Sequence, residues 1–315
     1  MMNNYRLPRP LGVLALLALS ACSGKVADID RIAFENPDVF PESITSNADG
    51  DLYIGSAGDG SVYRVQRGEE VATVWISSEE SGAMELLGVF ADENSSTLYA
   101  CSIAAGAPPE GADALSALYA FNLSTGATKA KYPLPGGAKA LCNDIAVGAS
   151  GTVYVSETMN GRVLRLTSGG AKLEVWAADE RLRGVNGIAV GSDGALYMNT
   201  FTSGKFFRIP VQTDGAAGAI SELAPSSPLN RPDGLRALGD MKFLQAEAGG
   251  RISEVEISSD QAIITPLKTG QGWSGVTSAN GRIWAVNPKA EYRMDPSMAD
   301  KDPNPFFIDA IDPAR

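Results

Sequence analysis

The chain has 315 residues, of which 44% are hydrophobic and 34 are glycine, as is typical of a compact β protein with many tight turns. Its formal net charge of -11 argues against a nucleic-acid partner, because phosphate binding needs a clustered basic surface. Histidine is absent, which excludes Ser-His-Asp triads, Cys-His dyads and His-ligated zinc. Any hydrolytic chemistry would therefore use carboxylates, amides, hydroxyls or a metal bound through oxygen.

Residues 1–21 have the pattern of a bacterial lipoprotein signal peptide. Two arginines precede an apolar run from Leu11 to Leu19, which is too short to span a bilayer as a mature helix. The following Leu19-Ser20-Ala21-Cys22 resembles a lipobox, in which cleavage leaves Cys22 as a lipidated N-terminus. The less favoured alternative is an ordinary secretory peptide with a chance cysteine.

This segment also predicts a location and a domain layout. Residue 23 is Ser rather than Asp, which by resemblance to Gram-negative lipoproteins favours the outer membrane, facing the periplasm. Residues 22–38 are expected to form a tether from the lipid, and residues 39–315 to form one domain. The expected membrane contact is therefore through Cys22 alone.

Six internal repeats predict the fold of that domain. Each repeat places an aromatic residue 8 to 10 residues after an aliphatic one, and these aromatics are Tyr53, Tyr99, Tyr154, Tyr197, Phe243 and Trp284. Repeats of roughly 40–50 residues that contain several short alternating segments are typical of a propeller. We therefore predict an all-β fold, a six-bladed β-propeller with four antiparallel strands per blade. Ile32 to Phe34 is expected to close the ring by joining the last blade.

The residues just before the first strand of each blade carry the candidate chemistry. In a propeller these strands line the central channel in the same direction, so the six positions meet at one end: Glu42, Leu87, Asn143, Asn186, Asp233 and Ser274. Four of them offer a carboxylate or amide oxygen, and a hard cation such as calcium would relieve their mutual repulsion. The alternative is that each is an ordinary turn residue bonded to its own backbone. Four such residues at equivalent places favour the metal.

A second set of polar residues lies at the ends of the second strands, which return to the same face. These are Ser56, Ser102, Glu157, Thr200, Glu247 and Asn287. Together they would form a polar rim suited to a small hydroxylated ligand. Individually, each is more often a solvated loop residue.

From Pro41 onward the chain resembles the family of senescence marker protein, gluconolactonase and luciferin-regenerating enzyme, which are six-bladed calcium-dependent propellers. The matching points, in the family's order and spacing, are Pro41-Glu42, Asn143-Asp144, Asn186-Gly187 and Pro232-Asp233-Gly234. The resemblance implies that Glu42, Asn186 and Asp233 bind the metal. It also implies that Asn143 contacts the substrate or the metal shell, and that Asp233 doubles as the acid/base group.

Two positions depart from the family pattern. The sugar-lactonase members carry an arginine two residues before the Asn of the Asn-Asp pair, where this chain has Leu141. They also place glycine after the first glutamate, where this chain has Ser43. Both departures bear on specificity for sugar lactones.

The leading hypothesis is a monomeric metal-dependent hydrolase, with calcium as its ion and a small lactone or related ester as its substrate. The ion would polarise the carbonyl, and Asp233, or Asp144 or Glu157, would accept the proton of an attacking water. With Thr200 and Glu247, Asp144 and Glu157 would also contact the substrate. The alternative is a non-catalytic propeller with a structural metal that binds a small ligand or a cell-envelope partner. An interaction scaffold without tightly bound metal is a third possibility.

Cys101 and Cys142 remain after Cys22 is assigned to lipidation. The first falls at the end of the second strand of blade two, and the second lies just before the first strand of blade three. The periplasm permits disulfides. A bridge and two free buried thiols are both compatible with the sequence.

Overall fold

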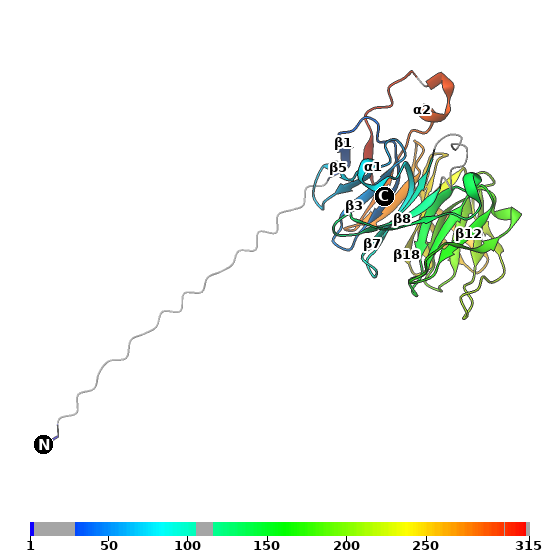
Figure 1. The fold of residues 1–315 in the computed structure, drawn as a ribbon, viewed down its shortest axis with the longest axis horizontal. Helices are drawn as coiled ribbons and strands as arrows, with labels where there is room; N and C mark the ends of the chain where they lie inside the picture. Colours follow the sequence, from blue (N-terminus) through cyan, green and yellow to red (C-terminus); the bar gives the residue numbers. More distant parts are fainter. Residues whose placement is uncertain (3–28, 105–115, 299, 313–315) are drawn as a thin grey trace.

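The computed structural model describes residues 1–2, 29–104, 116–298 and 300–312. Its 24 described strands form six blades of four antiparallel strands (Figure 1). Parallel pairing of β1 with β5 and of β17 with β21 joins two pairs of neighbouring blades into eight-stranded sheets. The fold is a six-bladed β-propeller, so the predicted fold class is confirmed. The predicted signal peptide and Cys22 lie outside the described residues. None of the helices within the described ranges is long and apolar enough to cross a membrane.

The first three blades follow the chain in order, each from its inner to its outer strand. Blade one consists of β2 (Pro41–Ser46), β3 (Leu52–Ser56), β4 (Val62–Val65) and β5 (Val71–Ile76). Blade two consists of β6 (Glu85–Asp92), β7 (Thr97–Ile103), β8 (Ala117–Asn122) and β9 (Thr128–Pro133). Blade three consists of β10 (Cys142–Val147), β11 (Val153–Glu157), β12 (Arg162–Leu166) and β13 (Glu174–Ala178).

The other three blades complete the ring. Blade four consists of β14 (Val185–Val190), β15 (Leu196–Thr200), β16 (Lys205–Ile209) and β17 (Ser221–Pro225). Blade five consists of β18 (Pro232–Gly239), β19 (Lys242–Glu247), β20 (Arg251–Ser258) and β21 (Gln261–Thr269). Blade six consists of β22 (Gly275–Ala279), β23 (Arg282–Val286), β24 (Phe307–Ile311) and β1 (Arg31–Phe34).

Short helical turns connect some of these strands. The α-helices are α1 (Ser78–Ser81), between blades one and two, and α2 (Glu291–Met294), in the long connection between β23 and β24. The 3-10 helices are η1 (Gly137–Lys139), η2 (Glu180–Leu182) and η3 (Pro296–Met298). Helix α2 projects from the body of the propeller, near one end of the ring (Figure 1).

The repeat is visible in the turns between first and second strands. In blade three, Gly151 adopts a φ of 76° and donates its N–H to the carbonyl of Gly148 at 2.9 Å. In blade four, Gly194 adopts a φ of 78° and donates to Gly191 at the same distance. A left-handed backbone at these places favours glycine, so the same turn chemistry produces the same hairpin in both blades.

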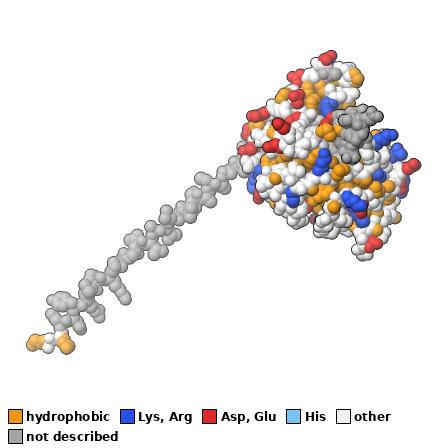
Figure 2. Space-filling model, in the orientation of Figure 1, with side chains coloured by type: hydrophobic (Ala, Val, Ile, Leu, Met, Phe, Trp, Pro, Cys, Tyr) orange, Lys and Arg blue, Asp and Glu red, His pale blue; other side chains and the backbone are white. Residues whose placement is uncertain are grey.

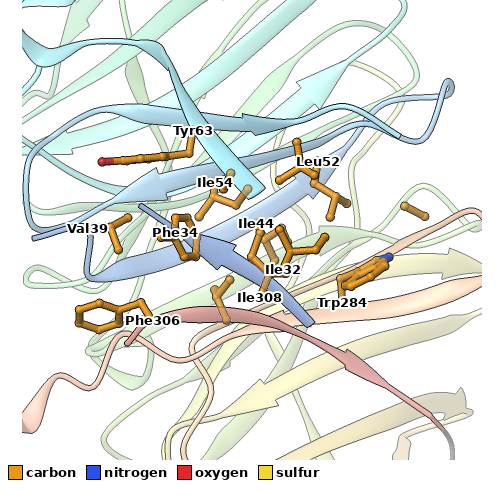
Figure 3. Close-up of a cluster of buried hydrophobic side chains, with 14 residues drawn as sticks. Ile32, Phe34, Val39, Ile44, Leu52, Ile54, Tyr63, Trp284, Phe306 and Ile308 are labelled. Atoms are coloured by element: carbon orange, nitrogen blue, oxygen red, sulfur yellow. The ribbon is translucent and has the colours of Figure 1, made fainter. Parts of the chain in front are cut away.

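The ring is closed by the N-terminal strand. β1 pairs antiparallel with β24 and, through its other edge, in parallel with β5 of blade one. It therefore completes blade six and joins the two ends of the chain. The segment from residue 31 to 34, which lies inside the range expected to be a tether, is part of this sheet. Figure 3 shows Ile32 and Phe34 pointing into a buried cluster with Ile44, Ile54 and Ile308.

Blade-to-blade packing forms the hydrophobic core. Six buried clusters link neighbouring blades, and all six repeat aromatics are at most 9% exposed. Burying both faces of each small sheet in this way removes the exposed edges that an isolated blade would have. On the face shown in Figure 2, Lys and Arg side chains are interspersed with acidic and uncharged ones.

Candidate functional site

The predicted site residues lie at β-bulges in the inner strands. Pairing with the second strand is interrupted in five of the six blades, between Pro41 and Ser43, Leu86 and Val89, Cys142 and Ile145, Val185 and Ile188, and Pro232 and Leu235. A bulge takes residues out of the regular alternation and can redirect their side chains. The first unpaired residues are Glu42, Leu87, Asn143, Asn186 and Asp233, and Ser274 lies just before the regular strand β22.

Glycines that follow the first bulge residue let the inner strands approach closely. A Cβ on Gly187 would lie 2.1 Å from the carbonyl oxygen of Asp233, and one on Gly234 would lie 2.6 Å from that of Ser274. Gly234 instead donates its N–H to the Ser274 carbonyl at 2.8 Å. The first bulge residues of neighbouring blades are thereby held side by side around the channel.

Glu42 and Asp233 share one electrostatic environment. Burial and then the charges of Asp233 and Asp144 raise the pKa of Glu42 well above its usual value. Burial and the charge of Asp144 likewise raise the pKa of Asp233, although a hydrogen bond from Asn186 and the charge of Arg231 oppose this. Because the charge of Asp144 acts on both Glu42 and Asp233, and that of Asp233 acts on Glu42, the three carboxyls lie at the same end of the channel. Blades one and five therefore contribute acids to a single site.

The amides of Asn143 and Asn186 are further oxygen donors at the site of the two carboxyls. Both residues are buried, at 7% and 6% exposure. The Asn143 Nδ2 donates to Thr158 Oγ1 at 2.9 Å, which leaves the amide oxygen as the acceptor that a cation could use. Thr158 is itself fixed through a 2.8 Å bond to the carbonyl of Val185, next to Asn186. The amides are therefore held in place by the blades that carry them.

This donor set fits a hard cation. Among the described residues, no group of three or more His, Cys, Asp or Glu side chains is arranged to hold a metal. The candidate set consists instead of two carboxylates and two amide oxygens, a combination that calcium accepts with waters completing its shell. Asp233 is buried and Glu42 is partly buried, and two carboxyls with raised pKa values are groups whose charge a divalent ion would compensate.

A buried arginine lies near the acids of the site, in addition to the oxygen-bearing residues that the sequence predicted. Arg236, three residues after Asp233 in β18, is 8% exposed and donates to both carboxylate oxygens of Asp144 at 3.0 and 2.8 Å. It also donates to Ser43 Oγ and to the Val89 carbonyl. One guanidinium thus links blades one, two, three and five across the channel. Asp144 is paired directly with Arg236, whereas Glu42 and Asp233 have no such ion pair and keep raised pKa values despite the nearby charges of Arg236 and Arg231.

Arg236 differs from the residues at the equivalent position of the other repeats, and this difference would have marked it as a site residue from the sequence. The equivalent position, three residues after the first bulge residue, is Thr45, Phe90, Ala146, Ala189 and Thr277 in the other blades. A lone charged residue there, in a strand that lines the channel, requires a buried partner. The partner is Asp144, which directly follows the first bulge residue of blade three. The equivalent residues in blades two, four and five are Gly88, Gly187 and Gly234, so only Asp144 among these four has a carboxylate.

Ser43 and Asp144 also connect neighbouring blades directly. Ser43 Oγ accepts a hydrogen bond from the backbone N–H of Val89 at 3.3 Å, and Asp144 Oδ2 accepts one from Ile188 at 3.2 Å. Both residues directly follow the first bulge residue of their blade. Each side-chain oxygen accepts a hydrogen bond from a backbone N–H of the next blade. Ser43, which replaces the family's glycine, therefore has a structural role that a glycine could not perform.

Three of the six expected rim residues, Glu157, Thr200 and Glu247, are not free polar side chains. Glu157 is fully buried and accepts hydrogen bonds from the backbone of Leu141, Met159 and Asn160, and from Arg162 Nε at 2.7 Å. Every acceptor site that a substrate or water would need is engaged. Glu157 therefore closes a turn and cannot serve as the general base considered from the sequence.

Glu247 and Thr200 have the same kind of role in their blades. Glu247 is 1% exposed and accepts from Arg251 Nε at 2.6 Å and from the backbone of Asn230 at 2.7 Å. Thr200 is fully buried and bonds Ser203 Oγ and the Lys205 N–H. Polar side chains at the ends of these second strands hold the adjoining turns in place. They do so because a buried polar group needs hydrogen-bond partners within the protein. Sequence position alone could not show where these side chains point.

A pocket of about 610 Å³ lies beside Asp233, between blades five and six. Its lining includes Phe201, Trp273 and Ser274 from the propeller, together with Glu291 and Met294 of α2. Arg231, two residues before Asp233, also lines it. The connection that carries α2 thus forms one wall of the pocket. Leu141, in the place of the family's arginine, lines a different hollow.

Cys101 and Cys142 form a disulfide, which decides between the two alternatives left open by the sequence. The bridge joins β7 of blade two to β10 of blade three, with a Cα–Cα separation of 5.1 Å. Cys142 directly precedes Asn143. The bridge therefore anchors the strand that carries the Asn143-Asp144 bulge.

Three solved structures show what this arrangement resembles. Regucalcin, a calcium-binding protein from Agrobacterium tumefaciens, matches at a TM-score of 0.62 and 14% identity, over 90% of this chain and 95% of that one. A gluconolactonase from Xanthomonas campestris matches at 0.61 and 16% identity, over 90% and 87%. A luciferin-regenerating enzyme matches at 0.65 and 10% identity, over 87% and 91%.

The chain has the fold of these propellers. The family described as "Strictosidine synthase-like, N-terminal" also matches by sequence, over residues 24–65, a range that includes Glu42 and its bulge. A comparison with curated proteins gave no match. The resemblance noted in the sequence is therefore confirmed at the level of structural relatives. At these identities the likeness shows the fold alone, since one fold can support many activities.

Proposed function

We propose that the protein is a metal-dependent hydrolase of a lactone or related ester, with calcium as its ion. The observation that carries the proposal is the meeting of Glu42, Asn143, Asn186 and Asp233 at bulges around one end of the channel. These residues would hold the ion through oxygen. When bound, such an ion polarises an ester carbonyl and stabilises the developing oxyanion.

The proton acceptor is best assigned to Asp233. Asp144 is occupied by Arg236, and Glu157 is occupied by its turn, so neither acid considered from the sequence is available. Asp233 lines the pocket and combines burial with an upward-shifted pKa, which makes its carboxylate a stronger base than that of an ordinary aspartate. Its carboxylate would orient a water against the carbonyl and accept the proton of that water.

The anchoring inferred from the sequence belongs to the same proposal. Lipidation at Cys22 would place the enzyme on the periplasmic side of the outer membrane. The described propeller begins close to residue 29, so only a few residues would separate the lipid from blade six.

Two measurements test the hydrolase. Chelator-treated protein titrated calorimetrically with calcium, magnesium, manganese and zinc should bind calcium, and a panel of lactones and aryl esters should be hydrolysed only with metal present. Asp233→Ala should lower kcat by about a hundredfold or more, because it removes both a ligand and the proton acceptor. Asp240→Asn, an exposed change in the same blade, is the control and should leave both measurements unchanged.

The competing binding module predicts a different outcome. Calcium binding without turnover of any lactone or ester would favour the non-catalytic propeller. Absence of metal binding would remove both the hydrolase and that alternative.

A further inference from the structure

Resting on the proposed hydrolase, we infer that the substrate is a lactone or ester with an apolar substituent rather than a polyhydroxylated sugar lactone. The substituent would occupy the pocket beside Asp233, in contact with Phe201 and Met294. The inference comes from which polar groups the site has available and from what lines the pocket.

Recognition of a sugar lactone requires free hydrogen-bonding side chains around the mouth, because each hydroxyl that loses water needs a partner. Of the expected rim residues, Glu157, Thr200 and Glu247 are each buried and engaged in their own turns. Asn287 does line the pocket, and its amide oxygen accepts the N–H of Lys289. The arginine with which sugar-lactonase members clamp substrate is Leu141 here, and its side chain lies at another hollow. The site therefore lacks these means of recognising hydroxyls.

The pocket beside Asp233 offers a different kind of surface. Phe201, Trp273, Pro288, Ala290 and Met294 contribute apolar side chains to it. Met294 is 80% exposed on α2, so a ligand that covered it would remove apolar surface from water. The charged lining residues other than Asp233 are Arg231, Glu291 and Asp295, and all three are exposed and already solvated. An alkyl or aryl group is what such a pocket binds best.

Three lactones with the same six-membered ring test the inference: δ-decalactone, δ-valerolactone and glucono-δ-lactone. The pentyl chain of the first should raise kcat/KM about tenfold or more over the other two, since each buried methylene favours binding. Met294→Ser should lower kcat/KM for δ-decalactone by about three- to fivefold, and by clearly less for δ-valerolactone, which has no chain to contact residue 294. Met159→Ser is the matched control, because Met159 is also an exposed methionine but lines the other hollow.

Binding of the unreactive lactams with the same shapes separates this inference from the proposed hydrolase. Calorimetry with the calcium-loaded protein should show tighter binding of the pentyl lactam than of gluconolactam. That preference without turnover of any lactone would overturn the hydrolase and leave the pocket assignment standing. Hydrolysis with a preference for glucono-δ-lactone would overturn the assignment and leave the hydrolase standing. Failure of the pentyl lactam to bind would also overturn the assignment.

Discussion

At the scale of single residues, the site contains three acids in two kinds of environment. Burial disfavours the charged forms of Glu42 and Asp233, whereas Asp144 forms an ion pair with Arg236. Burial and neighbouring carboxylates raise the pKa values of Glu42 and Asp233. An uncompensated buried carboxylate costs stability at neutral pH, and a bound cation can recover it. The same residues that make the site useful should therefore weaken the metal-free protein.

Replacing Asp233 with Asn tests this cost. The pKa of Asp233 in the folded state lies well above 3.8, so the folded protein binds the proton more tightly than the unfolded chain. Stability without metal should therefore fall as the pH rises from about 4 through the raised pKa. Asp233→Asn removes this loss and should stabilise the metal-free protein by about 1–2 kcal/mol at neutral pH, with a smaller difference toward pH 4.

Urea unfolding across this pH range, with chelator and with calcium, measures the effect. With saturating calcium the order should reverse, because binding stabilises only the native protein that retains its ligand. Asp240→Asn should follow the wild type in both conditions. If the wild type were the more stable protein in chelator at neutral pH, Asp233 would not carry a buried uncompensated charge.

Arg236 should act on the site through the residues that it holds. Arg236→Met leaves Asp144 buried and unpaired, which should cost about 3–5 kcal/mol of stability. Arg162→Met breaks the comparable buried pair with Glu157 and should cost a similar amount. Only Arg236→Met should also weaken calcium binding, by about tenfold, because Arg236 contacts Ser43 and Asp144, the neighbours of two proposed ligands.

Calorimetric titration with calcium, at a temperature where Arg236→Met and Arg162→Met are both folded, compares their calcium affinities. If Arg236→Met proved too unstable, the double change with Asp144→Leu would remove both charges and restore folding. Equal calcium affinities in the two arginine variants would show that Arg236 serves stability alone.

At the scale of elements, the inner-strand bulges do the positioning. Each takes one residue at the channel end out of the regular pairing, and in blades two, four and five a glycine at the next position lets the following blade approach. The disulfide between β7 and β10 reinforces this ring at blade three. The bulge geometry, rather than any helix or loop, therefore sets the spacing of the oxygen atoms.

Gly187→Ala tests the close approach of β14 and β18. The added Cβ would lie 2.1 Å from the Asp233 carbonyl oxygen, so the backbone that carries Asp233 must shift. Stability should fall by about 1–3 kcal/mol, and calcium affinity should fall with it. Gly148→Ala is the control, since its Cβ would meet Tyr154 at an ordinary 3.4 Å. Urea midpoints and calcium titrations that did not distinguish the two variants would contradict the role of this contact.

At the scale of the whole molecule, closure of the ring depends on a strand that is far from blade six in the sequence. β1 supplies Ile32 and Phe34, at 2% and 9% exposure, to the core between blades one and six. It also covers the edge of β24. The N-terminal region thus has a structural role in addition to the proposed lipid anchor at Cys22.

Two truncations separate these roles. A chain starting at residue 29 should be released from the membrane but should melt like the full-length protein. A chain starting at residue 36 should lose a further 3–6 kcal/mol or so, because two large apolar side chains are removed and the edge of β24 is exposed. Fractionation and thermal melting measure the two effects. Equal melting of both truncated chains would mean that β1 does not close the ring.

The repeat pattern predicted the fold and the residues that gather at the channel, because period and turn chemistry are local properties that the sequence carries directly. Six aromatics at regular spacing predicted six buried inter-blade contacts, and the equivalent positions of Glu42, Asn143, Asn186 and Asp233 predicted a common location. Both features follow from the symmetry of the ring alone.

Tertiary structure decided what breaks that symmetry. The pairing of Arg236 with Asp144, the engagement of Glu157 and Glu247 in their turns and the bond between Cys101 and Cys142 depend on side-chain directions and on distances between separate blades. A linear pattern specifies which strand a side chain belongs to, whereas its partner is selected by packing across the channel. Repetition along the chain determined where oxygen atoms could meet, and three-dimensional neighbours determined which of them stay free to bind.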